Sequence, residues 1–193
     1  MATHFARGIL TEGHLLSVLL PSQCHQEARN IPPHRQSRFL ASRGLLAELM
    51  FMLYGIGELP EIVTLPKGKP VFSDKNLPSF SISYAGNMVG VALTTEGECG
   101  LDMELQRATR GFHSPHAPDN HTFSSNESLW ISKQNDPNEA RAQLITLRRS
   151  VLKLTGDVLN DDPRDLQLLP IAGRLKCAHV NHVEALCDAE DVL

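Results

Sequence analysis

The stretch of alternating residues at Phe80–Ala85 constrains the fold more than any other part of this chain. Apolar and small polar side chains alternate there with period two, which predicts a β-strand. Gly86 and Asn87 form a two-residue turn signal, because glycine tolerates positive φ, and Met88–Thr94 predicts the returning strand. The chain is therefore expected to contain an antiparallel β-hairpin.

A third strand is expected directly after this hairpin, at Glu98–Leu105. Its odd-numbered residues are apolar, whereas Gly100, Asp102 and Glu104 would point to the opposite face of the strand. Asp102 and Glu104 would therefore lie on one face. Two carboxylates suit Mg²⁺, which takes one or two of them together with waters and substrate phosphates. Acids at this spacing are commonplace on exposed sheet faces, so the pattern alone is weak evidence for a metal site.

Two amphipathic helices are predicted, one before these strands in the sequence and one after them. Pro32-Pro33 precedes the first helix, in which apolar residues recur at three- and four-residue spacing until Gly55. Asp136, followed by Pro137, is an N-cap candidate for the second helix, which is expected to end at Gly156. The predicted core stripes are Phe39, Leu46, Leu49, Met50 and Leu53 in the first helix and Leu144, Leu147, Val151 and Leu154 in the second.

Several cationic residues occupy informative positions on this framework. Arg43 falls on the apolar stripe of the first helix, where structural salt bridging and ligand binding are equally reasonable explanations. Arg149 and Lys153 are four residues apart, opposite the core stripe of the second helix, and are expected to point into solvent. Lys67–Pro70 is a turn-forming segment with two ammonium groups. Such a set of cations would suit a polyphosphate ligand.

The order of a helix followed by strands occurs twice, although the two parts share no sequence identity. We therefore predict an α+β fold of two pseudo-symmetric halves, 1–108 and 109–193, each with a helix packed on a small antiparallel sheet and with a cleft between them. The stretch Thr109–Asn120, rich in His, Pro and Gly, is expected to be the connecting loop. Short strands are predicted at Leu166–Leu169, Leu175–Val180 and Val183–Cys187.

Composition excludes several classes of protein. The longest apolar stretch, Gly44–Gly57, has 14 residues, whereas a membrane span needs about 20. A net charge of −4 argues against a general nucleic-acid surface. The four cysteines are scattered without a C-x-x-C motif, and no leader peptide is recognisable, so we expect a cytoplasmic protein with reduced thiols. The histidine pairs lack further ligands at metal-binding spacing.

Short motifs between Arg35 and Gly156 point to a known enzyme family. They are Arg38–Arg43 with Leu45-Leu46, Gly68–Pro70, Phe80–Ser83, Gly100–Glu104, Phe123-Ser124 with Glu127, and Leu147–Gly156. In this order and spacing the chain resembles the Sfp-type 4′-phosphopantetheinyl transferases, the AcpT-like holo-acyl-carrier-protein synthases. The resemblance implies a transferase that binds coenzyme A between two α+β halves. With Mg²⁺ on the pyrophosphate, such an enzyme moves the phosphopantetheine arm to a serine of an apo acyl or peptidyl carrier protein and releases 3′,5′-ADP.

The resemblance also implies roles for individual residues. Asp102, Glu104 and Lys153 would be catalytic: the two carboxylates would hold Mg²⁺, and Lys153 would act at the phosphoryl group or in proton transfer. The residues expected to contact coenzyme A are Arg43, Lys69, Ser83, Tyr84 and Arg149. The expected partners are coenzyme A and a carrier protein, and neither nucleic acid nor a membrane is expected.

Three departures from the family pattern leave alternatives open. Arg149 stands where the family has a glutamate that binds the metal and often activates the serine, and Tyr84 stands where it has a histidine. The sequence after Asp191 stops before a further strand that family chains usually have, which suggests a truncated product. An active transferase could use Arg149 to clamp phosphate oxygens. A cation in place of a metal ligand would instead suit a catalytically impaired relative that binds coenzyme A or a carrier protein. An unrelated α+β binding protein is the third hypothesis.

Overall fold

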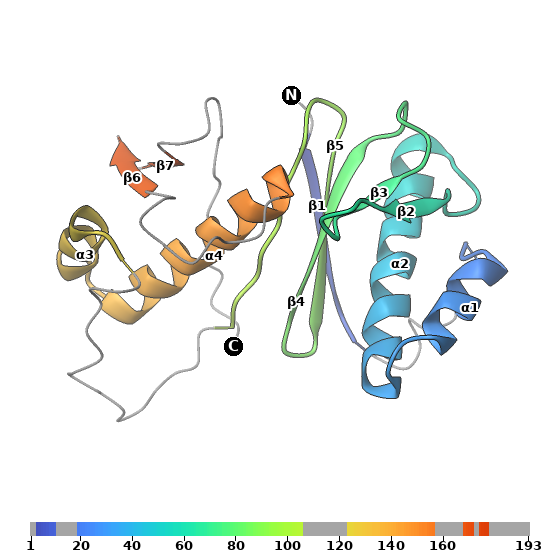
Figure 1. The fold of residues 1–193 in the computed structure, drawn as a ribbon, viewed down its shortest axis with the longest axis horizontal. Helices are drawn as coiled ribbons and strands as arrows, with labels where there is room; N and C mark the ends of the chain where they lie inside the picture. The colour runs from blue at the N-terminus through green and yellow to red at the C-terminus, as the bar shows by residue number, and fades with distance from the viewer. Residues whose placement is uncertain (1–2, 11–18, 106–122, 157–167, 172–173, 178–193) are drawn as a thin grey trace. The chain divides into compact units, whose positions relative to one another are not determined.

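The computed structural model describes residues 3–10, 19–105, 123–156, 168–171 and 174–177. The chain forms two compact units, one of Met1–Leu105 with Lys153–Asp157 and one of Gln106–Leu152 with Val158–Leu193. The elements are β1 (Thr3–Ile9), α1 (Ser22–Arg29), α2 (Pro33–Tyr54), β2 (Ile62–Thr64), β3 (Pro70–Phe72), β4 (Ser79–Ala85), β5 (Met88–Thr94), α3 (Ser125–Ser132), α4 (Pro137–Thr155), β6 (Leu168–Ile171) and β7 (Arg174–Cys177) (Figure 1). Helices and small antiparallel sheets confirm the α+β class. The pseudo-symmetry, the cleft and the boundary at 108 stay predictions.

The central sheet of the first unit has the strand order β1-β5-β4 and is antiparallel. The predicted hairpin is confirmed: Ser79 pairs with Thr94 at one end and Ala85 with Met88 at the other. Gly86 in the turn has a φ of 59°, a left-handed conformation that glycine adopts without strain. β1 was not predicted from the sequence, and it pairs with β5 along its whole length.

One face of this sheet is covered by α2, and α1 packs on α2 (Figure 1). The helix begins at Pro33 and ends before Gly55, whose φ is 67°, as the sequence predicts. Leu46, Leu49 and Met50 of the predicted stripe are buried, whereas Leu53 is exposed. The shared core consists of Leu20, Cys24, Leu46, Ala47, Leu49, Met50, Leu59, Phe72, Phe80, Val91 and Leu93.

The other face of the β4–β5 hairpin carries small residues. Strand alternation places three paired positions there: Ser79 with Thr94, Ser81 with Ala92, and Ser83 with Gly90. The segment 98–105 packs over this face: a Cβ added at Gly90 would lie 2.6 Å from Met103 Sδ and 3.2 Å from Leu101 Cδ2. A larger residue at Gly90 would therefore displace the segment.

The prediction of a third strand at Glu98–Leu105 is wrong, because this segment has no strand pairing. The predicted alternation of side chains is nevertheless present, since Leu101 and Met103 face the sheet. Their backbone amides donate to serine hydroxyls of β4 rather than to strand carbonyls. The segment consequently lies across the face of the sheet instead of extending its edge.

The second unit contains α3, most of α4 and the β6–β7 pair. The predicted start of α4 is confirmed, because Asp136 Oδ1 accepts hydrogen bonds from the amides of Asn138 and Glu139 at 2.9 and 3.1 Å. The core consists of Phe123, Ile131, Ala140, Leu144, Leu147 and Val151, with Trp130 and Ile145 packed against it. β6 and β7 overlap two predicted strands, whereas Thr109–Asn120 and Val183–Cys187 lie outside the described residues.

A buried ion pair joins α3 to α4. Ser124 and Glu127 form a capping box at the start of α3, and Nη2 of Arg148 donates to both carboxylate oxygens of Glu127 at 2.9 Å. The two side chains are 6% and 1% exposed, and the Arg148 guanidinium lies 5.7 Å from the centre of the Phe123 ring. The motif Phe123-Ser124 with Glu127 is therefore structural in the second unit, together with Arg148.

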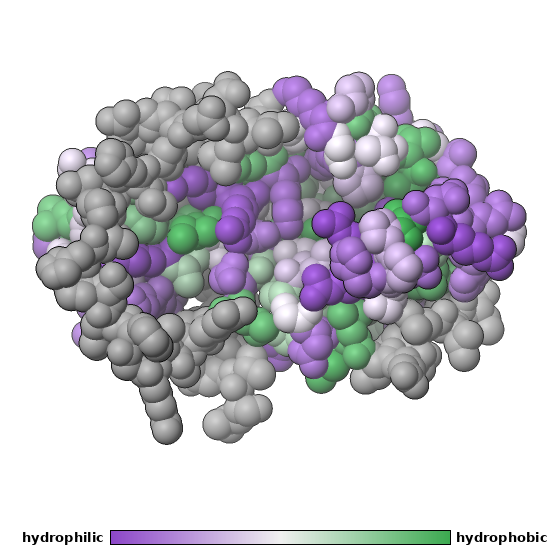
Figure 2. Space-filling view, turned by 60° about the horizontal axis from the view of Figure 1, so that its bottom comes forward, coloured by the Kyte–Doolittle hydropathy of each residue, from purple (hydrophilic) through white to green (hydrophobic). Residues whose placement is uncertain are grey.

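The surface of the described residues is mainly hydrophilic on the face shown in Figure 2, with apolar residues in separate patches. The last turn of α2 differs from this mainly hydrophilic surface, because four large hydrophobic residues are exposed there: Phe51, Met52, Leu53 and Tyr54. No helix within the described ranges combines the length and the apolar character that crossing a membrane requires.

Replacing Arg148 should destabilise the second unit strongly. Arg148→Met leaves the Glu127 carboxylate buried without its cation, a change that typically costs about 3–5 kcal/mol of unfolding free energy. Chemical denaturation followed by the fluorescence of Trp130, the only tryptophan of the chain, measures this loss. The control is Arg149→Met at the exposed neighbour, which should change stability by about 0.5 kcal/mol or less. Equal losses in the two variants would contradict the assignment.

Candidate functional site

Lys153 and Asp102 form an ion pair in the first unit. Lys153 belongs to the last turn of α4, and its Nζ donates to Asp102 Oδ1 and to the Leu101 carbonyl, both at 2.9 Å. The side chain of Asp102 is 9% exposed and that of Lys153 is 37% exposed. The expectation that Lys153 points only into solvent is therefore wrong, because a carboxylate and a carbonyl of the segment 98–105 attract its ammonium group.

Serine hydroxyls of β4 hold this segment in place. Ser81 Oγ accepts a hydrogen bond from the Leu101 amide, and Ser83 Oγ accepts one from the Met103 amide, both at 3.0 Å. The Ser83 hydroxyl also donates to Asp102 Oδ1 at 3.4 Å. Both serines are buried. They fix the backbone on each side of Asp102, and this fixes the direction of its carboxylate.

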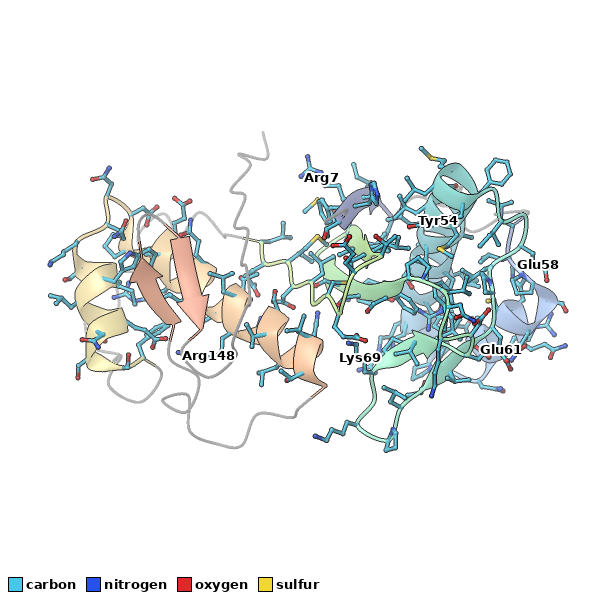
Figure 3. The ribbon with its side chains drawn as sticks, turned by 90° about the horizontal axis from the view of Figure 1, so that it is seen from above. Arg7, Tyr54, Glu58, Glu61, Lys69 and Arg148 are labelled. Carbon is cyan, nitrogen blue, oxygen red and sulfur yellow. The ribbon has the colours of Figure 1, made fainter. Side chains whose placement is uncertain are left out.

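Lys69 approaches the same region from the turn between β2 and β3. Gly68, with a φ of 90°, allows this turn, which is closed by a hydrogen bond from the Leu65 amide to the Lys69 carbonyl. Lys69 Nζ donates to Glu98 Oε2 and to the carbonyl of Leu154 in the last turn of α4. Figure 3 labels Lys69 beside the strands of the first unit.

Glu98 is a member of this cluster that the sequence analysis did not identify. Its carboxylate also accepts a hydrogen bond from Ser79 Oγ at 2.9 Å. Desolvation by burial raises the pKa of Glu98, but the hydrogen bonds from Lys69 and Ser79 outweigh it and leave the pKa below its usual value. The serines at positions 79, 81 and 83 were the visible signal, because each of them binds the segment that contains Glu98.

Arg43 and Tyr84 lie on the opposite face of the sheet, next to α2. Tyr84 follows Ser83 in β4 and therefore points the other way, where its hydroxyl donates to Ser42 Oγ of α2 at 2.8 Å. The Arg43 guanidinium lies 4.6 Å from the centre of the Phe39 ring. Hydrogen bonds thus join Ser83 and Lys153 to Asp102, and Lys69 binds the same helix end through the Leu154 carbonyl. Arg43 and Tyr84 lie apart from these residues, on the α2 side of the sheet.

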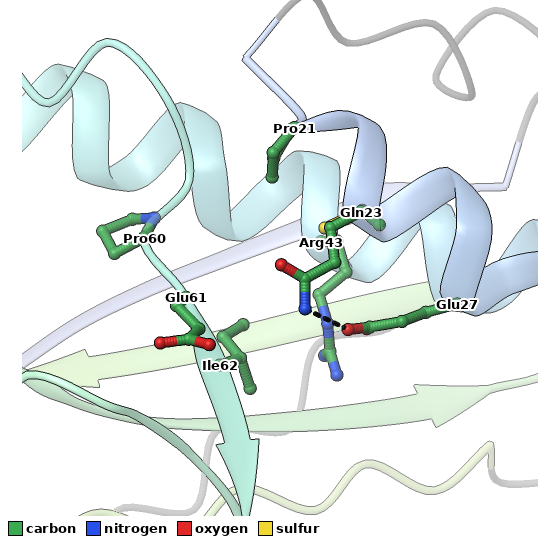
Figure 4. A pocket seen from close by; sticks show the side chains of 8 residues that line it. Pro21, Gln23, Glu27, Arg43, Pro60, Glu61 and Ile62 are labelled. Atoms are coloured by element: carbon green, nitrogen blue, oxygen red, sulfur yellow. Dashed lines mark hydrogen bonds between the residues drawn. The ribbon is translucent and has the colours of Figure 1, made fainter.

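A small pocket surrounds Arg43 (Figure 4). It is lined by Pro21, Gln23, Cys24, Glu27, Arg43, Pro60, Glu61 and Ile62. Burial lowers the pKa of Arg43, and this effect is partly offset by Tyr84, Cys24 and Glu27. Within the described parts of the chain, Arg43 makes no hydrogen bond or ion pair. An anion entering this pocket would therefore meet a cation that no described carboxylate binds directly.

Glu104 and Arg149 are both exposed, and Arg149 belongs to the second unit. No group of three or more His, Cys, Asp or Glu side chains suited to a metal ion occurs among the described residues. Asp102 and Glu104 offer two carboxylates, which is sufficient for Mg²⁺ when waters and phosphates complete its shell. Carboxylate oxygens are suitable ligands for Mg²⁺, although one oxygen of Asp102 already pairs with Lys153.

The two buried cysteines of the first unit, Cys24 and Cys99, are free thiols. Burial raises the pKa of Cys99 to about 11, although a hydrogen bond with Ser79 and the charge of Lys69 oppose this increase. The thiolate is the reactive form of cysteine, so a high pKa makes Cys99 a packing residue rather than a nucleophile.

Removing the Ser81 hydroxyl should loosen the segment that contains Asp102. Ser81→Ala deprives the Leu101 amide of its acceptor, and a buried donor without a partner costs about 1–3 kcal/mol. Hydrogen exchange should show faster exchange at Leu101, and chemical denaturation should show the stability loss. Ser73→Ala, at an exposed serine just after β3, is the matched control. Unchanged exchange at Leu101 would refute the role given to Ser81.

Comparison with known proteins places the chain among bacterial relatives. No protein-family model matches it. The chain is 99% identical over all 193 residues to proteins named uncharacterized protein YieE from Escherichia coli strains K12 and CFT073, and it spans 78% of their length. It is 34% identical over 88 residues to the 4′-phosphopantetheinyl transferase AcpT of Escherichia coli O157:H7. The matched residues make up 46% of this chain and 41% of AcpT. The chain is thus distantly related to phosphopantetheinyl transferases, and it belongs to the family of the Escherichia coli protein YieE.

Proposed function

We propose that this chain transfers the 4′-phosphopantetheine arm of coenzyme A to a serine of an apo carrier protein, with Mg²⁺, and releases 3′,5′-ADP. The observation that carries the proposal is the cluster of Lys69, Asp102 and Lys153 around the last turn of α4. The distant similarity to AcpT supports the same class of reaction. Lys153 pairs with Asp102 and Lys69 with Glu98, and ammonium groups together with carboxylates suit a ligand that combines phosphates with a divalent cation.

Phosphoryl transfer depends mainly on positioning and on the neutralisation of charge. In the proposed reaction, Lys69 and Lys153 donate hydrogen bonds to phosphate oxygens. Asp102 and Glu104 would hold Mg²⁺, which would supply further charge neutralisation at the pyrophosphate. Ser83 orients Asp102 through its hydroxyl. The carrier serine attacks the phosphorus atom next to the pantetheine arm, and 3′,5′-ADP leaves.

Arg43 would bind a second anionic part of coenzyme A on the α2 side of the sheet. Two observations support this role: its guanidinium lines a pocket, and it forms no ion pair within the described ranges. β4 is an edge strand of the sheet, so a long ligand could reach both Lys69 and Arg43 by passing over this edge. Tyr84 would contribute a hydroxyl on the same side as Arg43, and Arg149 would clamp a phosphate.

The alternative is a catalytically impaired relative that binds coenzyme A or a carrier protein. Two observations favour it: Arg149 is a cation where related enzymes have a metal-binding acid, and Lys153 already pairs with Asp102. Both features would weaken Mg²⁺ binding. The two functions differ in one product, because only the transferase modifies the carrier protein.

Mass spectrometry of an apo carrier protein incubated with the chain, coenzyme A and Mg²⁺ tests the transferase. The expected result is a carrier that gains one phosphopantetheine arm. Lys153→Ala should slow the transfer about 100-fold, since it removes the ammonium group that the proposal assigns to the phosphoryl group. Lys75→Ala, at an exposed lysine, should leave the rate unchanged. An unmodified carrier, together with calorimetric binding of coenzyme A, would favour the binding protein instead.

Restoring an acid at position 149 tests the metal site. Arg149→Glu should tighten the Mg²⁺ dependence and raise the transfer rate, because it adds an oxygen ligand and removes a repulsive cation. Arg149→Gln separates the two effects, since it removes the cation without adding a carboxylate. Transfer rates across a Mg²⁺ titration measure both variants. A lost activity in Arg149→Glu would identify Arg149 as a phosphate clamp, and an unchanged profile would place it outside the site.

A further inference from the structure

Glu98 binds the ammonium group of Lys69, which the proposed function assigns to a phosphate of the ligand. A lysine ammonium has three hydrogen-bond donors. Lys69 uses one on Glu98 Oε2 and one on the Leu154 carbonyl. The Lys69 side chain is 11% exposed, whereas that of Glu98 is 59% exposed. The lysine is therefore largely covered, whereas the carboxylate that it binds remains open to solvent.

We propose that Glu98 is an internal substitute for the ligand phosphate at Lys69, and that it must move aside when a polyphosphate ligand binds. The inference rests on the proposed function for the identity of that ligand as coenzyme A. It adds a specificity-determining residue that the motifs of the sequence do not indicate.

The contacts of Glu98 make such an exchange feasible. Its carboxylate is held by Lys69 and by the hydroxyl of Ser79. The Glu98 side chain is 59% exposed, so water can solvate its carboxylate when it leaves Lys69. The hydrogen bond to Leu154 keeps Lys69 in place during the exchange.

The exchange also determines which anions can bind. A ligand with a single carboxylate replaces Glu98 by an equivalent group and gains nothing at Lys69. A phosphate group offers more negative charge and three strong acceptor oxygens, so it can outcompete the internal carboxylate. Glu98 thus sets a threshold that favours polyphosphates over carboxylates.

Calorimetry with coenzyme A and, separately, with inorganic pyrophosphate tests the proposal at 0.15 M salt, where charges more than about 8 Å apart are largely screened. Glu98→Gln should tighten both affinities about two- to fivefold, because it removes the carboxylate charge that competes with the ligand for Lys69. Glu96→Gln removes the same charge two residues away at an exposed position and should have a smaller effect. In a Lys69→Met background, Glu98→Gln should no longer tighten binding. Thermal unfolding shows that each variant is folded.

The two probes separate this inference from the function. Tighter pyrophosphate binding without any coenzyme A binding would support the exchange at Lys69 and overturn the proposed function. Weaker binding of both probes by Glu98→Gln would show that Glu98 positions Lys69, which would overturn the inference. Equal affinities in Glu98→Gln and the original protein, or no binding of either probe, would also overturn it.

Discussion

The hydrogen bonds from the backbone amides of Leu101 and Met103 to serine hydroxyls of β4 organise the first unit. They exist because the β4–β5 face is built from small residues, with Gly90 opposite Ser83, so that another piece of backbone can approach closely. In an ordinary sheet a neighbouring strand would supply the acceptors. Here the side chains supply them, and the segment bearing Asp102 lies on top of the sheet.

Charge then connects this layer to the end of α4. Lys153 reaches the Asp102 carboxylate, and Lys69 donates to the Leu154 carbonyl one residue later in the helix. The last carbonyls of a helix have no partners within it, so an ammonium group is favourable at this point. Two lysines from distant parts of the sequence are consequently held near one helix end, which is the basis of the function proposed here.

Local periodicity predicted α2, α4 and the β4–β5 hairpin, because each depends on neighbours within a few residues. It failed for 98–105, since an alternating pattern does not distinguish a strand at the edge of a sheet from a segment packed on its face. The presence of Gly90 and of the serines in β4 decided that question. The pairs Arg148 with Glu127 and Lys69 with Glu98 join residues 21 and 29 positions apart, beyond the reach of periodicity. The alternation within β4 could have shown that Ser83 and Tyr84 point to opposite faces.

The spacing of the serines limits how the gene for this chain can change. Ser81 and Ser83 bind Leu101 and Met103, two residues apart in both segments, so the length of the connection from Thr94 to Cys99 determines which residue lies between the two anchored amides. Deletion or insertion of one residue in that connection would place a leucine or a methionine where Asp102 now stands and would turn the carboxylate towards Gly90. Such an indel would remove the acid from the cluster without altering any of the residues that form it.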